Sequence, residues 1–230
     1  MKRYDPRVEQ TRKKHRLPAW AVTPTFILGI IIVAAALVMA IGVTTMAWAA
    51  TEVKTAEELT SAINAGDVVD VKLGASFAAN VVIPTGKTVT IDLNGNTLTN
   101  DGGDTITVQK GAALIINGSG TVDNVTHGKA AIVNNGTATL NGGTYTRSKE
   151  NAENNKDNAG GNSYYTILTD KGATMTINAG VTVTNVGHFS SMIRNGGTGP
   201  DASTLTINGG TFSGGINTVK NDEAGVLVIK

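Results

Sequence analysis

The segment Thr204–Phe212, TLTINGGTF, carries the pattern that decides the fold. Its apolar residues alternate with threonines, an Asn and two glycines follow, and a short Thr-containing run closes the segment. Four other segments repeat this pattern and align on the same Asn: TVTIDLNGNTL, AALIINGSGTV, TATLNGGTY and TMTINAGVTV. The shared asparagines are Asn94, Asn117, Asn141, Asn178 and Asn208.

These asparagines are separated by 23, 24, 37 and 30 residues, a repeat length typical of solenoids and arrays. Between them lies a second kind of apolar run that ends in polar residues and Gly. We therefore expect each rung to hold two or three short strands, with Gly and Asn at the turns. The second runs are Ile106–Ala112, Ala131–Ala138, Thr166–Ala173, Ser191–Gly197 and Asn217–Gly225.

The composition favours a thin, regular β architecture over a compact enzyme. Aromatic residues make up 4% of the 230 residues, and 28 residues are Gly. Short runs of Val, Ile, Leu and Thr between glycines are typical of all-β repeat proteins. The absence of Cys excludes disulfide frameworks and thiolate metal sites.

An antiparallel fold is the structural alternative. Asn-Gly between apolar runs is also the strongest signal for a two-residue β-hairpin, so five hairpins would give similar local strings. The copies align over the whole rung and not only at the turn, which hairpins alone do not require. We therefore predict a parallel solenoid.

Charge is distributed unevenly along the chain. Residues 1–25 hold seven Lys or Arg against two acidic residues, whereas the chain from Ala50 onward holds twelve basic and sixteen acidic residues. The chain from Ala50 onward is mildly acidic overall, so it lacks the excess of basic residues that nucleic-acid binding needs. We expect residues 1–25 to be a basic cytoplasmic segment, and we expect no nucleic-acid partner.

Residues 26–49 read as an export signal. Phe26–Val43 is eighteen apolar or Gly residues without a charge. Ala47 and Ala49 match the small-residue pattern of a signal-peptide cleavage site, which predicts cleavage before Ala50. The alternative is an uncleaved membrane anchor, since eighteen residues of helix reach about 27 Å. Both alternatives place the repeats outside the cytoplasm, in the extracellular space or on the cell surface.

Residues 50–66 are expected to be a linker and a capping helix. In Thr55–Ala65, Thr55 and Glu58 form a capping box, the apolar residues share one face, and Gly66 ends the helix. The first rung of a solenoid exposes apolar edges that such a helix would cover. A partner-binding helix is the alternative. Residues 67–230 then form the repeats.

The helix, the Asn-Gly-Gly-Thr units and the interleaved strands together resemble the right-handed parallel β-helix, the pectate-lyase-like fold found in bacterial cell-surface proteins. The resemblance covers residues 52–230. It implies that the five asparagines stack as a ladder inside the turn, each amide bonding the next rung. Asn178 departs from the pattern because Ala179 follows it.

Two intervals between repeats contain polar insertions. Ser148–Ser163, SKENAENNKDNAGGNS, has no apolar periodicity and is expected to loop out. Asn195–Ser203, NGGTGPDAS, is a shorter loop of the same kind. Insertions in solenoids often carry binding surfaces, although a tolerated solvated loop explains them equally well.

Clusters that could perform catalysis or hold a metal are not evident. Asp92 aligns with Ile115 and Thr139, so the carboxylates do not stack. Asp123 and Arg147 are expected to form a surface pair of little energetic weight. His127 and His188 have no second ligand at metal spacing and are expected at the surface. We expect no metal and no cofactor.

Four residues are candidates for binding a glycan: Tyr164, Tyr165, Arg147 and Arg194. The tyrosines adjoin the long insertion and could stack on a sugar ring, with core packing as the alternative. The arginines could contact anionic sugars, although an exposed solubilising role explains them as well.

The sequence predicts an exported bacterial surface protein with a structural or adhesive role, which displays loops to a glycan or a host partner. The alternatives are the N-terminal part of a β-helix polysaccharide lyase or glycoside hydrolase, and a scaffold without a ligand. Leu227–Lys230 aligns with Leu205–Asn208, within a rung. We therefore expect further chain or a partner to cover that edge.

Overall fold

The computed structural model describes residues 49–149, 165–185, 191–197 and 201–230. The chain divides into two units, Met1–Ala47 and Trp48–Lys230, and the fold below is that of the second unit. The predicted basic segment, Phe26–Val43 and Ala47 lie outside the described residues. None of the described helices is both long enough and apolar enough to cross a membrane.

The described strands form two sheets, and every strand pair is parallel. The strands are β1 (Thr51–Val53), β2 (Val68–Leu73), β3 (Phe77–Ala78), β4 (Val81–Ile83), β5 (Thr88–Asp92), β6 (Thr97–Thr99), β7 (Ile106–Val108), β8 (Ala113–Asn117), β9 (Thr121–Asp123), β10 (Ile132–Asn134), β11 (Thr137–Thr146), β12 (Ile167–Thr169), β13 (Thr174–Asn185), β14 (Ile193–Asn195), β15 (Thr204–Ile207), β16 (Thr211–Gly214), β17 (Val219–Asn221) and β18 (Val226–Ile229). The antiparallel alternative is therefore wrong.

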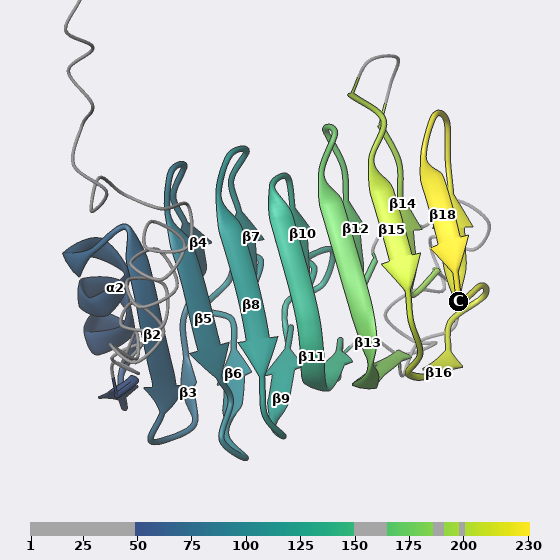
Figure 1. Cartoon of the computed structure of the whole chain (residues 1–230). Helices are drawn as coiled ribbons and strands as arrows, with labels where there is room; N and C mark the ends of the chain where they lie inside the picture. Colours follow the sequence, from purple (N-terminus) through teal and green to yellow (C-terminus); the bar gives the residue numbers. More distant parts are fainter. Residues whose placement is uncertain (1–48, 150–164, 186–190, 198–200) are drawn as a thin grey trace, which may run out of the picture. The chain divides into compact units, whose positions relative to one another are not determined.

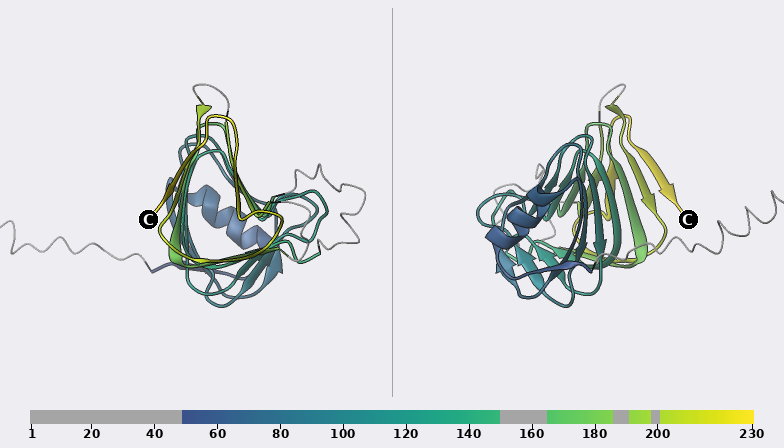
Figure 2. Two further views of the ribbon diagram at one scale, coloured as in Figure 1. Left: turned by 90° about the vertical axis from the view of Figure 1, so that its right-hand side faces the viewer. Right: turned by 60° about the vertical axis from the view of Figure 1, so that its left-hand side comes forward.

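The strands stack as rungs of a parallel β-solenoid (Figure 1). One sheet runs in the order β1-β2-β5-β8-β11-β13-β15-β18, and the other runs β17-β14-β12-β10-β7-β4. The long strands β11 and β13 continue past the first sheet's main path to pair with β9 and β16 on a third side. Along the stack, the rungs superpose in a three-sided outline (Figure 2).

The core consists of columns of apolar side chains that face inward from all three sides. One column of the first sheet joins Val89, Leu114, Ala138, Met175 and Leu205, all at most 1% exposed. Because side chains alternate across a strand, the residues between them face outward. The alternation of apolar residues in the repeats thus gives each rung its inner face.

The register expected from the alignment of the repeats holds at the last rung. β15 pairs with β18 so that Leu205 lies beside Leu227 and Ile207 lies beside Ile229. Ile229 is 69% exposed, whereas Ile207 is buried. The inward column that is enclosed in earlier rungs is thus open to solvent on β18.

Helix α2 (Ala56–Ala65) agrees with the predicted helix to within one residue. Thr55 is its N-cap and accepts a hydrogen bond from the Glu58 amide. Leu59 and Ile63 are buried and belong to the same hydrophobic cluster as the strands. The helix is therefore part of the solenoid's core.

One detail of this helix differs from the sequence prediction. The Glu58 carboxylate accepts from the amide of Lys54, one residue before the N-cap, instead of from Thr55. Gly66 ends the helix, as predicted, and its backbone is extended, with φ −153°. The Lys87 ammonium reaches from the β4–β5 turn and donates to the Gly66 carbonyl, so a side chain satisfies this helix end.

The register also corrects the predicted alignment of the acidic residues. Asp92 lies beside Asn117, and Thr90 lies beside Ile115, so the prediction was displaced along the strand. Asp123 lies beside Thr146 instead of Arg147. The shift at Asp92 is two positions and keeps the same face of the sheet, whereas the shift at Asp123 is one position and moves the neighbouring side chain to the opposite face.

Candidate functional site

Four of the five repeat asparagines form a hydrogen-bonded column. The side-chain amides of Asn141, Asn178 and Asn208 each donate to the side-chain oxygen of the preceding Asn, at 2.7–2.8 Å. The column starts at Asn117. We call Asn117, Asn141, Asn178 and Asn208 the outer Asn column.

The outer Asn column lies at the surface, contrary to the buried ladder that was expected. Asn141 and Asn208 are exposed, and Asn117 and Asn178 are half-buried. The residue after Asn141 is Gly because adjacent rungs approach closely there. A Cβ on Gly142 would lie 2.7 Å from the Gly118 carbonyl oxygen. The stacking of these asparagines was predicted correctly, but the prediction that their side chains are buried was wrong.

The rung at Asn178 accommodates its Ala by a bulge. Leu140 lies beside Ile177 and Gly142 lies beside Gly180, so β13 carries one more residue than β11 over this stretch. Asn178 still bonds Asn141 across the irregularity. The departure in sequence therefore changes the turn without breaking the column.

Asn94 does not join the column. Its φ is +48°, and it forms a tight turn with Gly95. Its side-chain amide donates to the Leu73 carbonyl at 3.0 Å, in the preceding rung. A left-handed backbone, which Asn tolerates better than most residues, directs this side chain elsewhere.

A second polar column, which the sequence analysis missed, lies inside the solenoid at the carboxyl ends of the second sheet. It continues the inward-facing position of Ile83 and Val108, but its members are polar. We call these residues the inner polar column. They are Asn134, Thr169, Asn195 and Asn221.

Three members of the inner polar column are 0% exposed. Asn134 donates to the Thr174 carbonyl at 3.0 Å and accepts from the Gly136 amide at 3.1 Å. Asn195 donates to the Asn221 side chain at 2.7 Å and to the Val226 carbonyl at 3.0 Å. These side-chain amides pair with backbone groups at the turns that connect the two sheets.

Three buried oxygens near the inner polar column have no hydrogen-bond partner within the described part of the chain. They are Thr169 Oγ1, Asn195 Oδ1 and Ser203 Oγ. Buried polar atoms are normally satisfied by protein or by ordered water. This corner is therefore less completely bonded than the corner around Asn134.

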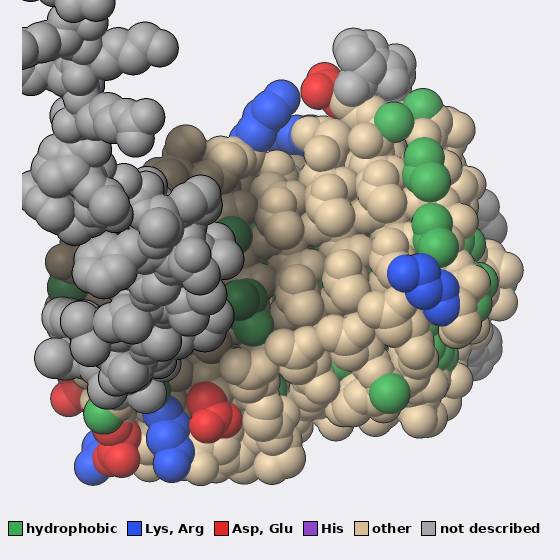
Figure 3. Space-filling view, viewed as in Figure 1, with side chains coloured by type: hydrophobic (Ala, Val, Ile, Leu, Met, Phe, Trp, Pro, Cys, Tyr) green, Lys and Arg blue, Asp and Glu red, His purple; other side chains and the backbone are tan. Residues whose placement is uncertain are grey.

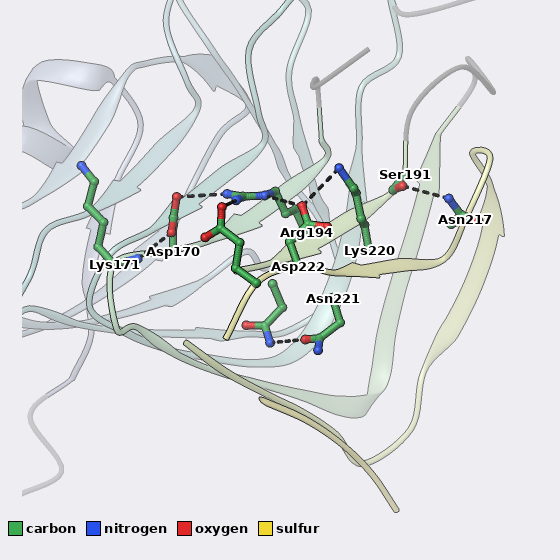
Figure 4. Close-up of polar contacts among 10 residues, drawn as sticks. Asp170, Lys171, Ser191, Arg194, Asn217, Lys220, Asn221 and Asp222 are labelled. Carbon is green, nitrogen blue, oxygen red and sulfur yellow. Dashed lines mark hydrogen bonds and ion pairs between the residues drawn. The ribbon is translucent and has the colours of Figure 1, made fainter. Parts of the chain in front are cut away.

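Outside the same corner, charged side chains from the two neighbouring rungs surround Arg194 (Figure 4). Arg194 Nη1 lies 3.0 Å from Asp170, Nε lies 3.0 Å from Asp222, and Nη2 lies 3.9 Å from Glu223. Lys220 adds a contact of 3.1 Å to Asp222. We call these five residues the Arg194 cluster.

The pKa values in the Arg194 cluster follow from these contacts. Burial by itself opposes the charge on Asp222, but hydrogen bonds from Arg194 and Lys220 outweigh it, so the pKa of Asp222 is lowered. The hydrogen bond to Asp222 raises the pKa of Lys220, and the nearby Tyr165 adds to the rise. The contact between Asp222 and Lys220 thus favours the charged form of both side chains.

Arg194 is neither exposed nor free to act as a simple anion site. Its side chain is 17% exposed, and two carboxylates hold it at hydrogen-bond distance. The prediction of an exposed, solubilising arginine was wrong. An anionic sugar would have to displace Asp170 or Asp222, so the geometry favours a clamp between rungs.

Arg147 is also buried, at 0% exposed, where sequence reasoning placed it at the surface. The prediction relied on the general exposure of arginines, which fails when the fold encloses and partners the side chain. Its neighbour Ser148 donates from its amide and hydroxyl to the Asp123 carboxylate. Asp123 is 8% exposed, so it anchors the root of the long insertion instead of forming a surface pair.

The structure describes one of the two candidate tyrosines, Tyr165, and one of the two histidines considered as ligands, His127. Tyr165 is 7% exposed, which agrees with core packing and removes it as an open sugar platform. Tyr164 and His188 lie outside the described residues. His127 is exposed, as expected.

Across the described ranges, no three His, Cys, Asp or Glu side chains are grouped so that they could hold a metal ion. Asp170, Asp222 and Glu223 converge, but they converge on the Arg194 guanidinium. Their charges are therefore already directed to a cation of the protein itself. The expectations of no metal and no cofactor stay predictions.

Comparison with known proteins gives no identity for the chain. No protein-family model matches it, and neither the curated proteins nor the solved structures contain a significant match.

Proposed function

We propose that the chain is an exported surface protein with a right-handed parallel β-helix of the pectate-lyase-like kind, which displays its long insertion to a glycan or host partner. In this proposal α2 closes the first end of the stack. Phe26–Val43 serves as an export signal cleaved after Ala49, or as a membrane anchor.

One observation carries the display role: the ladder continues in register on both sides of the insertion. Ile132 lies beside Ile167, and Thr137 lies beside Thr174, although residues 150–164 intervene along the chain. Rungs that pair normally on either side allow the insertion to vary without cost to the core.

The ends of the insertion are held firmly. Before it, Asp123 accepts two hydrogen bonds from Ser148, and Arg147 is buried. After it, Tyr165 and Thr166 are buried, and the Thr166 amide donates to the Met192 carbonyl at 2.9 Å. Fixed ends lower the entropic cost of ordering a loop against a partner.

The test replaces residues 150–163 with a short Gly-Ser linker and measures binding to an array of neutral and acidic glycans and to host cells. We expect binding to be lost while the thermal unfolding midpoint stays within error of the parent. Replacing residues 186–190 in the same way is the control and should leave binding intact. Retained binding after the first replacement would refute the display role.

A polysaccharide lyase or hydrolase is the rival function. Hydrolysis usually needs two carboxylates about 5 to 10 Å apart across the bond, and the register places Asp92 beside Asn117 and Asp123 beside Thr146. We expect no reducing ends or unsaturated products from a panel of polysaccharides. Turnover that Asp123→Asn abolishes would show that the rival is right.

A further inference from the structure

The outward face of the first sheet repeats one three-residue set on three successive rungs. Outward positions of β11, of β13, and of β15 with the residue that follows it carry Thr, Thr and then Asn. We call these nine residues the Thr-Thr-Asn grid. They are Thr137, Thr139 and Asn141, then Thr174, Thr176 and Asn178, then Thr204, Thr206 and Asn208.

The grid is a true lattice because its rows lie in register. Thr137 lies beside Thr174, which lies beside Thr204, and the second Thr column pairs in the same way. The bulge in β13 falls after Ile177, beyond both Thr columns. Adjacent rungs are about 4.8 Å apart, and alternate residues along a strand are about 6.6 Å apart.

The side chains of the grid are accessible and uncharged. Each of the nine is exposed or half-buried, and each is Thr or Asn. In Figure 3 the middle of this face is free of the colours of Lys, Arg, Asp and Glu. Outward Ala113 and Ile115 on one side and Val226 and Val228 on the other bound the grid.

The side chains are also ordered before any ligand arrives. Thr is β-branched, so its χ1 is restricted, and identical neighbours on a regular ladder favour the same rotamer. The third column is fixed by the amide-to-amide hydrogen bonds of Asn141, Asn178 and Asn208. The grid therefore presents hydroxyl and methyl groups at fixed, repeating positions.

A periodic surface of this kind complements a ligand that is itself periodic. In ice, oxygens hydrogen-bond tetrahedrally at about 2.75 Å, which puts second neighbours about 4.5 Å apart and repeats the lattice about every 7.3 Å along the hexagonal axis. The rung spacing of about 4.8 Å differs from the first distance by about 0.3 Å. Over three rungs the mismatch grows to only about 0.6 Å.

The strand spacing of about 6.6 Å is about 0.7 Å shorter than the axial repeat, a difference spread over a single step between the two Thr columns. Threonine suits such a surface because its hydroxyl can replace a lattice water while its methyl group excludes mobile water. A crystalline polysaccharide fits less well, since the grid offers no aromatic ring for a sugar to stack on.

We propose that the Thr-Thr-Asn grid binds the surface of ice. This inference goes beyond the proposed display function and does not depend on it, because the grid lies on β11, β13 and β15 and not on the insertion. The binding is non-covalent adsorption of an ordered water lattice onto hydroxyl and methyl groups.

The test measures inhibition of ice recrystallisation and thermal hysteresis with the purified full-length chain. We expect both activities in the parent chain. Thr176→Tyr, at the centre of the grid, should remove them, because the ring would hold the ice surface away from the neighbouring threonines. Tyr is favourable in strands, so the thermal unfolding midpoint should stay near that of the parent.

Thr107→Tyr is the matched control, since Thr107 is also half-buried and faces outward from a strand, but it lies in the second sheet between Val82 and Val133 and outside the grid. It should leave both activities unchanged. Absence of activity in the parent chain would overturn the inference, as would equal loss in both variants. Pull-down by insoluble cellulose or chitin without ice activity would assign the face to a polymer instead and would equally overturn it.

Discussion

The outer Asn column and the inner polar column use the same amide group in opposite environments. Asn141 is exposed and bonds other asparagine side chains, whereas Asn134 is 0% exposed and bonds backbone groups of its turn. A buried backbone group that loses its partner costs far more than an exposed one, which water can satisfy. The column that is less obvious in the sequence should therefore contribute more stability.

The largest expected effect comes from Asn134→Ala. It leaves the Thr174 carbonyl and the Gly136 amide without their partner and opens a small cavity. We expect a loss of about 2 to 3 kcal/mol in the free energy of unfolding, measured by urea titration. A loss no larger than that of Asn141→Ala would contradict the contrast between the columns.

Acid should weaken the C-terminal end of the inner polar column through the Arg194 cluster. The folded-state pKa of Asp222 is lowered, so its contribution is present above its unfolded pKa, about 3.9, and is lost as the pH falls through the folded pKa. The pKa of Lys220 is raised, so its contribution is lost only as the pH rises through the folded pKa, above about 10.4.

Asp222→Asn tests this acid dependence. Urea unfolding at pH 6 and pH 3 should show a smaller loss of stability in the variant than in the parent. Glu223→Gln is the control, because Glu223 lies 3.9 Å from Arg194 and is more exposed. Equal losses for the parent and Asp222→Asn would show that Asp222 does not couple the rungs.

Thr169→Val tests whether an unsatisfied polar group of the inner polar column destabilises the fold. Thr169 Oγ1 is buried and has no hydrogen-bond partner among the described residues, so the change removes an unsatisfied group at nearly constant volume. We expect a gain of about 1 kcal/mol, visible as a higher thermal unfolding midpoint. A clear loss would indicate that an ordered water satisfies this hydroxyl.

The smallest effect should come from Asn141→Ala in the outer Asn column. It breaks two amide-to-amide bonds, but water replaces them at this exposed position. We expect a loss of about 0.5 kcal/mol by urea titration. A loss above that of Asn134→Ala would mean that the exposed column, and not the buried one, holds the rungs together.

Much of the fold could be predicted because its signals are local and repeated. Alternating apolar residues placed inward side chains such as Leu205 and Ile207 correctly, and the repeat length separated a solenoid from hairpins. The capping residue Thr55 and the apolar face of α2 were also readable. Each of these features depends on neighbours within one rung or on the copying of a rung.

The site was harder to predict because it depends on which way each corner turns. Asn134 and Asn117 both precede a Gly-containing turn, yet Asn134 lies one residue farther from its Gly and faces inward. Arg194 and Arg147 read as surface charges, and the stacking of rungs enclosed both. The carboxylates around Arg194 come from rungs 24 and 28 residues away along the chain.

The sequence alone determined the repeat, the parallel ladder, the inward apolar columns and the helix α2, because hydrophobic periodicity and turn residues act over short distances. The tertiary structure alone decided which asparagines are buried, which arginines are neutralised and which threonines share a lattice. Those properties depend on how each rung stacks on the next. A shift of a single residue at a corner exchanges the inner and outer faces of the strand.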